Sequence, residues 1–500
     1  MPTLRLFPLG VELPVRTGSS LSDILFPLGV EFPCGGEGTC GGCRVRLLRG
    51  ELAISPEMRQ TLTEEELRAG WRLACCARVA GDLTLEIEQW TAHVLADDTH
   101  CAFEPRPGCA VAFDVGTTTL AAQLVDLETG AILGVRTALN PQAVLGADIM
   151  TRVKAALEHE QGAARLASLI RGAAGALTAD LVRAAGRADL REVWLCGNTV
   201  MHHLFGGVDV EPLSHVPFEP STLAALRFAP RELGWNLPEQ AEVIFLPCIG
   251  GFVGSDVLAG IAATGIAERE ELAALLDLGT NGEIVLGNRH RLLAASTAAG
   301  PAFEAGCISM GMRAAEGAIT HVYFRDGGFQ CRVLGGGAPR GICGSGLVSA
   351  VALARETGLI GPGGRFANGK EWLLADPVRL TQGDIRQLQL AKGAIAAGVR
   401  LLLEQWGASL ESLRAVYLAG AFGNYVDVTD AWRLGLLEMD PKRVHPAGNA
   451  ALRGTKLIAL NPSARDHWLR DLPSRVVHVS LHTDARFQDT FVDCLAFPEG

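Results

Sequence analysis

The chain has 500 residues, 48% of them hydrophobic, and a formal net charge of −11. This length exceeds one ordinary hydrophobic core, so we expect two to four domains. The acidic balance argues against a nucleic-acid partner, because phosphate binding needs a basic face. The N-terminus lacks a signal peptide's apolar region and no window holds 18 consecutive apolar residues, so we expect no membrane partner and a cytoplasmic location. Thirteen cysteines in such a protein favour metal ligation or free thiols over disulfides.

A glycine-rich loop with three cysteines marks the first predicted unit, residues 1–92. The loop reads PCGGEGTCGGC, with the spacing C-x5-C-x2-C, and the later phrase WRLACCARV adds two adjacent cysteines. Glycines let backbone N–H groups point at sulfur, which stabilises the negative charge of a metal cluster. The spacing is one residue longer than the plant-type [2Fe–2S] pattern C-x4-C-x2-C. Zinc is the alternative, but zinc sites usually pair two C-x2-C knuckles and only one occurs here.

The loop resembles that of adrenodoxin-type ferredoxins, which implies a [2Fe–2S] cluster held by four thiolates. Cys75 is the predicted fourth ligand because the family phrase RLAC ends there, and Cys76 is the alternative. Neighbouring residues on a strand point to opposite faces, so only one of the two can bind. The predicted metal ligands are Cys34, Cys40, Cys43 and Cys75.

Short elements surround this loop, and a linker follows them. The sequence predicts a hairpin over residues 3–7 and 11–15, a helix over 21–26, and strands over 44–48 and 83–87. Residues 93–108 end in a run of prolines and glycine and are predicted to form a linker.

Two short apolar strands further on end in the same Asp-x-Gly-Thr sequence. The first reads VAFDVGTTT over residues 111–119, and the second reads LLDLGTNGEI over residues 275–284. Glycine lets the backbone approach a ligand, hydroxyls and free N–H groups favour an anion, and aspartate suits the divalent cation that accompanies a polyphosphate. We predict that the two loops are halves of one clamp, with the contacts Asp114, Gly116, Thr117, Thr118, Asp277, Gly279, Thr280, Asn281 and Gly282.

The remaining elements alternate between strands and helices. A meander follows the first loop, then an alanine-rich helical stretch runs to about residue 187, and strands are expected at 193–196, 243–249 and 416–419. His202 and His203 are interpreted as packing residues. Helices are expected at 257–265 and 380–406, then a helix at 448–452, and strands at 455–460 and 475–479. Further ligand contacts are predicted at a helix N-terminus and at a run of small residues that could lie against a flat base: Gly344, Gly346, Gly420, Ala421 and Gly423.

The series FDVGTTT, DLGTNGE, YLAGAFG and GNAAL resembles the actin, heat-shock chaperone and sugar-kinase (ASKHA) superfamily, in which two RNase-H-like lobes close on ATP. The resemblance implies phosphate loops at 114–118 and 277–282, an adenosine contact at 418–423 and a connecting helix at 447–452. The implied fold is a multidomain α/β and α+β protein. A β-grasp ferredoxin domain precedes two ATPase lobes, at residues 109–270 and 271–500.

The whole chain resembles the reductive activators of corrinoid proteins, on the phrases CGGEGTCGGC, RLACCARV, NPQAVLGADIMTRV, GNTVMHHLFG, STAAGPAFEAG and GICGSGL. This implies an ATP-hydrolysing enzyme that returns the Co(II) corrinoid of a methyltransferase system to Co(I). The implied cofactors are a [2Fe–2S] cluster, ATP and Mg²⁺. The implied partners are a corrinoid protein and an upstream low-potential electron donor, and a homodimer is one possible assembly. Some members carry an extra middle segment before the ATPase part, which we expect to be absent here.

In this reading Asp114 and Asp277 are the catalytic carboxylates, which hold Mg²⁺ and orient the attacking water. Which carboxylate acts as base stays open. Glu283 is a third candidate, although alternation along its strand could turn it away.

Two alternative functions stay open from the sequence. One is an ATP-regulated redox-sensing binding protein without useful turnover. The other is an ATP-driven electron donor to a different low-potential metalloenzyme, such as a 2-hydroxyacyl-CoA dehydratase. Activators of that enzyme resemble dimers sharing one [4Fe–4S] cluster, which does not suit the cysteine loop found here.

Overall fold

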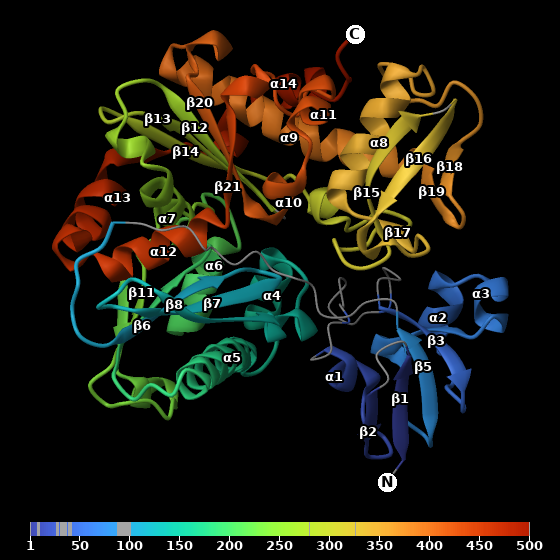
Figure 1. Cartoon of the computed structure of the whole chain (residues 1–500), viewed down its shortest axis with the longest axis horizontal. Helices are drawn as coiled ribbons and strands as arrows, with labels where there is room; N and C mark the ends of the chain where they lie inside the picture. The colour runs from blue at the N-terminus through green and yellow to red at the C-terminus, as the bar shows by residue number, and fades with distance from the viewer. Residues whose placement is uncertain are drawn as a thin grey trace.

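The computed structural model describes residues 2–7, 11–26, 30, 38, 43–87, 102–279, 281–325 and 327–499. Figure 1 shows three α/β bodies: a small N-terminal body in blue, a first lobe in cyan and green, and a second lobe in yellow to red. Cys34, Cys40 and Thr280 lie outside the described residues, and so does most of the loop that joins the first body to the lobes.

The N-terminal body is a five-stranded sheet with the order β2-β1-β5-β3-β4. Its central strand pairs in parallel with β1 and in antiparallel with β3, and side chains along β5 alternate so that Leu83, Leu85 and Ile87 face the core. The predicted β-grasp ferredoxin arrangement is confirmed. Its elements are β1 (Thr3–Phe7), β2 (Val11–Pro14), α1 (Leu21–Leu25), β3 (Arg44–Arg49), α2 (Pro56–Thr61), α3 (Glu64–Arg68), β4 (Trp71–Leu73) and β5 (Leu83–Ile87).

The first lobe is built on a six-stranded sheet with the order β10-β11-β9-β6-β7-β8. Three strands form an antiparallel meander, and two further strands join it in parallel. Helices cover both faces, which is why β6 is an almost unbroken apolar run. The strands are β6 (Cys109–Val115), β7 (Thr119–Asp126), β8 (Ile132–Leu139), β9 (Leu190–Cys196), β10 (Leu226–Phe228) and β11 (Glu242–Phe245).

Alternate residues of β6 belong to two different cores. Val111 and Phe113 pack with α4 (Ile149–Glu158), α5 (Gly162–Ala184) and α6 (Thr199–Gly206) on one face. Ala110 packs on the other face with α7 (Ser255–Thr264). The predicted alanine-rich helical stretch consists of two helices, α4 and α5. It is interrupted between them, where Gln161 adopts a left-handed conformation with φ of 60°.

The second lobe repeats the architecture of the first, with the strand order β21-β20-β12-β13-β14-β22. Again a three-stranded antiparallel meander is joined by two parallel strands. Each Asp-x-Gly-Thr loop connects the first two strands of its meander, so the prediction of two RNase-H-like lobes is confirmed. The strands are β12 (Ala273–Leu278), β13 (Gly282–Gly287), β14 (Leu292–Thr297), β20 (Ala415–Ala419), β21 (Val444–Gly448) and β22 (Val476–His478).

Helices and two small sheets cover the outer side of the second lobe. The predicted helix over 380–406 is α9 (Gln382–Trp406), and Thr381 and Asp384 form its capping box. The other elements are β15 (Ala318–Arg325), β16 (Gly328–Val333), β17 (Gly341–Ile342), α8 (Gly344–Glu356), β18 (Glu371–Ala375), β19 (Val378–Thr381), α10 (Gly420–Tyr425), α11 (Val428–Arg433), α13 (Leu472–Arg475) and α14 (Phe487–Asp493).

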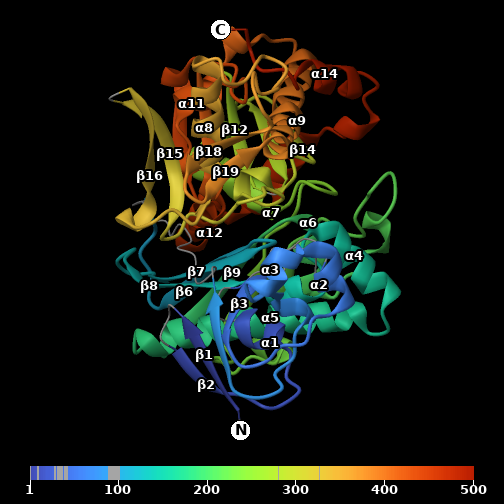
Figure 2. The ribbon, with the colours of Figure 1, turned by 90° about the vertical axis from the view of Figure 1, so that its right-hand side faces the viewer.

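Helix α12 (Ala450–Leu460) leaves the second lobe and lies on the first, beside α7 (Figures 1 and 2). The predicted strand at 455–460 is therefore wrong, and one continuous helix replaces the expected helix and strand. The hydrophobic pattern of a short apolar run that is buried on several sides does not distinguish a strand from a helix. The two helices cross very closely, because an added Cβ on Gly454 would lie 1.8 Å from the Ala259 carbonyl oxygen.

The described part of the predicted linker, residues 102–108, is held against the end of α12. Glu104 N–H donates to the Leu460 carbonyl at 3.1 Å, and the Arg106 guanidinium donates to Glu192 and to the Ala459 carbonyl, each at 2.8 Å. Arg465 donates to the same Glu192 carboxylate at 2.6 Å, so one half-buried acid ties three segments together. Within the described ranges, no helix is both long and apolar enough to cross a membrane.

Candidate nucleotide and iron–sulfur sites

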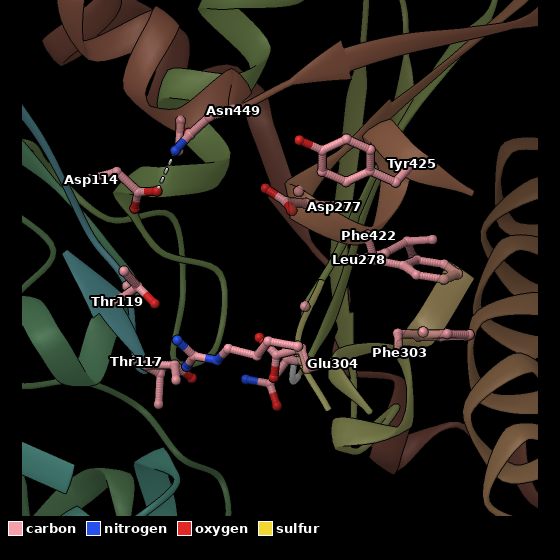
Figure 3. Close-up of a pocket in the computed structure, with 18 of the residues that line it drawn as sticks. Asp114, Thr117, Thr119, Asp277, Leu278, Phe303, Glu304, Phe422, Tyr425 and Asn449 are labelled. Carbon is pink, nitrogen blue, oxygen red and sulfur yellow. Dashed lines mark hydrogen bonds between the residues drawn. The ribbon is translucent and has the colours of Figure 1, made fainter. Parts of the chain in front are cut away.

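A cavity of about 290 Å³ lies between the two lobes (Figure 3). The first predicted phosphate loop faces it with Asp114, Gly116, Thr117 and Thr118, and Asp277, Gly279 and Asn281 face it from the second lobe. The structure thus brings most of the two predicted loops to opposite walls of one space.

The first phosphate loop is a tight turn that hydrogen bonds within the loop and from neighbouring side chains hold in place. Gly116 N–H donates to the Thr119 carbonyl at 3.1 Å, and an added Cβ on Gly116 would lie 2.6 Å from that oxygen, so glycine is needed there. The Asn198 side chain donates to the Thr117 hydroxyl at 2.9 Å. Asn449, the cap of α12, donates to the Asp114 carboxylate at 2.9 Å, which joins the second lobe to this loop (Figure 3).

Aromatic rings form the opposite end of the cavity. Phe303 and Phe422 stack with ring centroids 4.5 Å apart and planes 23° from parallel (Figure 3). Gly344 and Gly420 line the cavity beside them. Glycines that leave space beside the flat, apolar surface of the two rings suit a nucleobase. The polar loops at the other end suit the phosphates of the nucleotide.

Three glycines predicted as ligand contacts, Gly282, Gly346 and Gly423, lie behind the residues that line the cavity. Added Cβ atoms would lie 1.9 Å from Ile395 at Gly282, 2.1 Å from the Ile319 carbonyl at Gly346, and 3.0 Å from Leu418 at Gly423. These glycines allow helices and strands to pack closely. The small residues from Gly420 onward form α10 instead of an open loop, and the Ala421 side chain is not described.

Five carboxylates line the cavity, from Asp114, Asp256, Asp277, Glu283 and Glu304. Burial raises the pKa of Asp114 to about 6, although the Asn449 hydrogen bond opposes it. Burial, with a smaller effect from neighbouring carboxylates, raises the pKa of Asp256 and of Asp277 to about 7. Burial, then the charges of Asp256 and Asp277, raises the pKa of Glu283 well above its usual range. Such a crowded acidic site favours a cation.

Glu283 points into the cavity, contrary to the alternation argument. It is the direct cross-strand partner of Asp277 in the β12–β13 pair, and directly opposed residues share a face of the sheet. Oxygen ligands of this kind suit Mg²⁺. In the described part of the chain no three acidic, histidine or cysteine side chains converge closely enough to hold a metal ion alone. A magnesium ion at this site would therefore depend on water and phosphate oxygens as well.

The described part of the cysteine site brings two predicted ligands together. Arg44 pairs with Leu73 across β3 and β4, and the next residue, Ala74, donates its N–H to the Cys43 carbonyl at 3.0 Å, which brings the following Cys75 close to Cys43. Their sulfur atoms lie 3.3 Å apart, far beyond a disulfide bond. Two thiolates on one tetrahedral metal at ~2.3 Å lie ~3.8 Å apart, so the pair is placed to share one iron.

Cys76 also lies near this pair. Its sulfur is 3.5 Å from the Cys75 sulfur and packs at Gly38, where an added Cβ would lie 2.6 Å away. The geometry therefore favours Cys75 over Cys76 as the partner of Cys43.

Three segments of the chain match known families. Residues 5–80 match the 2Fe–2S iron–sulfur cluster binding domain, residues 109–269 the RACo middle region, and residues 271–500 the C-terminal ASKHA domain of RACo. The chain is 32% identical over 418 residues to the corrinoid activation enzyme RamQ of Eubacterium limosum, which covers 77% of this chain and 70% of that protein. The chain belongs to the family of corrinoid reductive activators.

Other activators agree with this membership. The [Co(II) methylated amine-specific corrinoid protein] reductase of Methanosarcina barkeri is 28% identical over 423 residues, covering 77% of this chain and 76% of that protein. A solved structure of a reductive activator for a corrinoid, iron–sulfur protein superposes with a TM-score of 0.72 at 26% identity, covering 100% of this chain and 99% of that one.

Membership of the activator family decides two questions left by the sequence. The iron–sulfur domain match supports a [2Fe–2S] cluster over zinc, and the ASKHA match implies ATP binding. The middle region of the family, matched by residues 109–269, coincides with the first lobe described above.

The cavity of this activator also contains residues that were not among the predicted contacts. Asn198, Asp256, Phe303, Phe422 and Asn449 all reach it from segments far apart in the chain. A signal was available for two of them, because Phe422 lies in the predicted adenosine contact at 418–423 and Asn449 lies in the predicted connecting helix at 447–452. His202 and His203 are fully buried in the first lobe, where burial lowers the pKa of His202 to about 4, as expected for packing residues.

Proposed function

We propose that this protein is an ATP-dependent reductive activator, which passes one electron from its [2Fe–2S] cluster to the Co(II) corrinoid of a methyltransferase system and restores Co(I). The observation that carries the proposal is the presence, in one chain, of a cysteine pair placed for iron and a two-lobed cavity with facing phosphate loops. The names of its relatives, which act on corrinoid proteins, support the choice of partner.

The energetic reason for joining the two sites is the low potential of the Co(II)/Co(I) couple. Plant-type clusters lie near about −400 mV, which is generally too high. Each 100 mV of shortfall costs about 2.3 kcal/mol for one electron. An ATP-driven change between conformations can offset this if one state binds the Co(II) partner better than the other. An upstream low-potential donor must then reload the cluster. The homodimer is a separate prediction, and sedimentation analysis of the purified protein would test it.

The cavity residues divide into three roles in this proposal. Thr117, Thr118 and Asn281 hydrogen-bond phosphate oxygens, and Phe303 and Phe422 pack against the base. Mg²⁺, when bound, would neutralise charge on the phosphates.

The carboxylates carry the remaining role, which is to hold the cation and the attacking water. Asp114 and Asp277 hold the cation, directly or through water. We assign Asp256 as the base that accepts a proton from the attacking water, because it lines the same cavity and is not one of the two carboxylates that hold the cation.

Nucleotide binding should depend on pH through these carboxylates. Since their pKa is raised to about 7 in the free protein, part of the population is protonated at neutral pH and must lose a proton before a cation binds. We expect the affinity for the Mg²⁺ complex of a non-hydrolysable ATP analogue to fall from pH 8 to pH 6 by about tenfold in total for each proton displaced, because a carboxylate with a pKa of about 7 is mostly charged at pH 8 and mostly neutral at pH 6. Calorimetry in buffers of different ionisation enthalpy measures both quantities. An Asp256→Asn variant should show a smaller slope, and an equal slope would contradict this origin.

The decisive experiment is anaerobic mixing of the reconstituted protein with reductant and a Co(II) corrinoid protein. We expect the Co(I) absorbance band to rise with ATP and to stay low with the non-hydrolysable analogue. A nucleotide-dependent change in partner affinity without any Co(I) would instead support the redox-sensing binding protein. Co(I) formation at the same rate and extent without ATP would overturn the proposal.

A further inference from the structure

One segment, residues 139–152, contacts both the first phosphate loop and the ferredoxin domain. It contains the 3-10 turn Pro141–Val144 and the start of α4. Its Asn140 is fully buried, donates from its side chain to the Gly116 carbonyl at 2.9 Å, and donates from its backbone to the Thr118 carbonyl at 2.8 Å. Asn140 therefore binds two backbone carbonyl groups of the phosphate loop, those of Gly116 and Thr118.

Arg152 holds the middle of the same loop. Its fully buried guanidinium donates to the Thr117 carbonyl at 2.5 Å, and to the Gly146 carbonyl and the Gln142 side chain at 2.9 and 3.2 Å. Burial lowers the pKa of Arg152 to about 9, which the charge of Asp148 only partly offsets. A polyphosphate on the loop would supply the missing negative charge, so nucleotide binding and the position of this segment are linked.

The other side of the segment is apolar. Leu139, Ala143 and Val144 are half-buried and pack against the hydrophobic core of the ferredoxin domain, the same core against which Cys75 and Cys76 pack. One short turn thus lies between the backbone of the phosphate loop and the domain that carries the cluster ligands.

The second lobe also reaches the ferredoxin domain. Arg340, directly before β17, donates to the carbonyl of Ile87 at 3.4 Å, at the end of β5. Strand β17 exchanges hydrogen bonds of 2.9 Å with Met310 and Met312, and Met312 lines the cavity. The ferredoxin domain therefore contacts a segment of each lobe that is hydrogen-bonded to residues of the cavity wall.

We propose that the segment 139–152 couples the nucleotide site to the ferredoxin domain, so that nucleotide binding on the phosphate loop changes how that domain is seated against the two lobes. The inference rests on the proposed function, because it needs ATP in the cavity. Asn140 and Arg152 are positioning residues, since they hold the loop and do not themselves line the cavity. The coupling needs different ferredoxin contacts in the two nucleotide states.

Hydrogen exchange of the full-length, anaerobically reconstituted protein tests this, with and without the Mg²⁺ complex of a non-hydrolysable ATP analogue. The reporter is the peptide that contains β5, Leu83–Ile87. Typical coupling between sites is 5–150-fold, so we expect nucleotide to change its exchange rate at least about fivefold in the wild type. A Val144→Asp variant should lose that response while it binds the analogue as the wild type does.

Two further variants make the result interpretable. Leu157→Asp introduces the same charge at an exposed apolar residue of α4 in the same lobe and should keep the response. If Val144→Asp loses its cluster absorbance, the milder Val144→Ser takes its place and should weaken the response.

The outcomes separate the coupling from the proposed function. Analogue binding without any change at β5 in the wild type overturns the coupling and leaves the proposed function intact. A full response in the Val144 variants overturns it as well. Failure of the wild type to bind the analogue at all overturns the proposed function and the coupling together.

Discussion

Replacing Cys75 by serine is expected to remove the [2Fe–2S] cluster, whereas replacing the adjacent Cys76 leaves it in place. The Cys75 sulfur lies 3.3 Å from the Cys43 sulfur, a distance that suits two ligands of one iron, whereas the Cys76 sulfur packs at Gly38. Visible absorbance, electron paramagnetic resonance after reduction, and iron content of the reconstituted protein measure the effect. Electron delivery to a corrinoid should be lost in Cys75→Ser.

The Cys75 and Cys76 variants are matched controls for each other, because each removes one thiol and the two positions are adjacent. Cys43→Ser should behave as Cys75→Ser does. Normal iron content in Cys75→Ser together with loss of the cluster in Cys76→Ser would show that the fourth ligand is misassigned.

Replacing Asp277 by asparagine is expected to reduce ATP turnover by about 10²-fold or more while the cluster spectrum stays unchanged. Asparagine keeps the shape of the side chain but removes the charge needed for the cation. Phosphate release under steady-state conditions measures turnover. Corrinoid reduction should fall in parallel, because the electron transfer depends on hydrolysis.

Asp466→Asn serves as the control, since Asp466 is exposed and outside the cavity. It should hydrolyse ATP as the wild type does. Asp256→Asn and Glu283→Gln compare the other carboxylates, and we expect the larger loss for Asp256 if it accepts the proton. Wild-type turnover by Asp277→Asn would remove Asp277 from the mechanism.

Much of the fold was predictable because it depends on local chemistry. An apolar strand that ends in Asp-x-Gly-Thr needs a tight turn, and two such turns indicated two similar lobes. The alternation of β5 and the capping box at Thr381 were equally visible in the sequence. The failures involve tertiary contacts, such as α12, whose apolar residues are buried against the other lobe.

The site was less predictable because its residues converge from distant segments. Asp256 begins a helix in the first lobe, Asn449 caps one after the second lobe, and the stack of Phe303 on Phe422 joins residues more than a hundred positions apart. No motif records these contacts. The direction of Glu283 stayed open for the same reason, since the alternation rule fixes it only once its partner strand is known.

The crossing of α12 onto the first lobe has a consequence for synthesis on the ribosome. Helix α7 ends at Thr264, and the helix that covers it begins only at Ala450. At about 5–20 residues per second, this face of the first lobe stays uncovered for roughly 10–40 s after it emerges. During that interval the nascent chain exposes an apolar surface, which makes it a natural client for a holding chaperone.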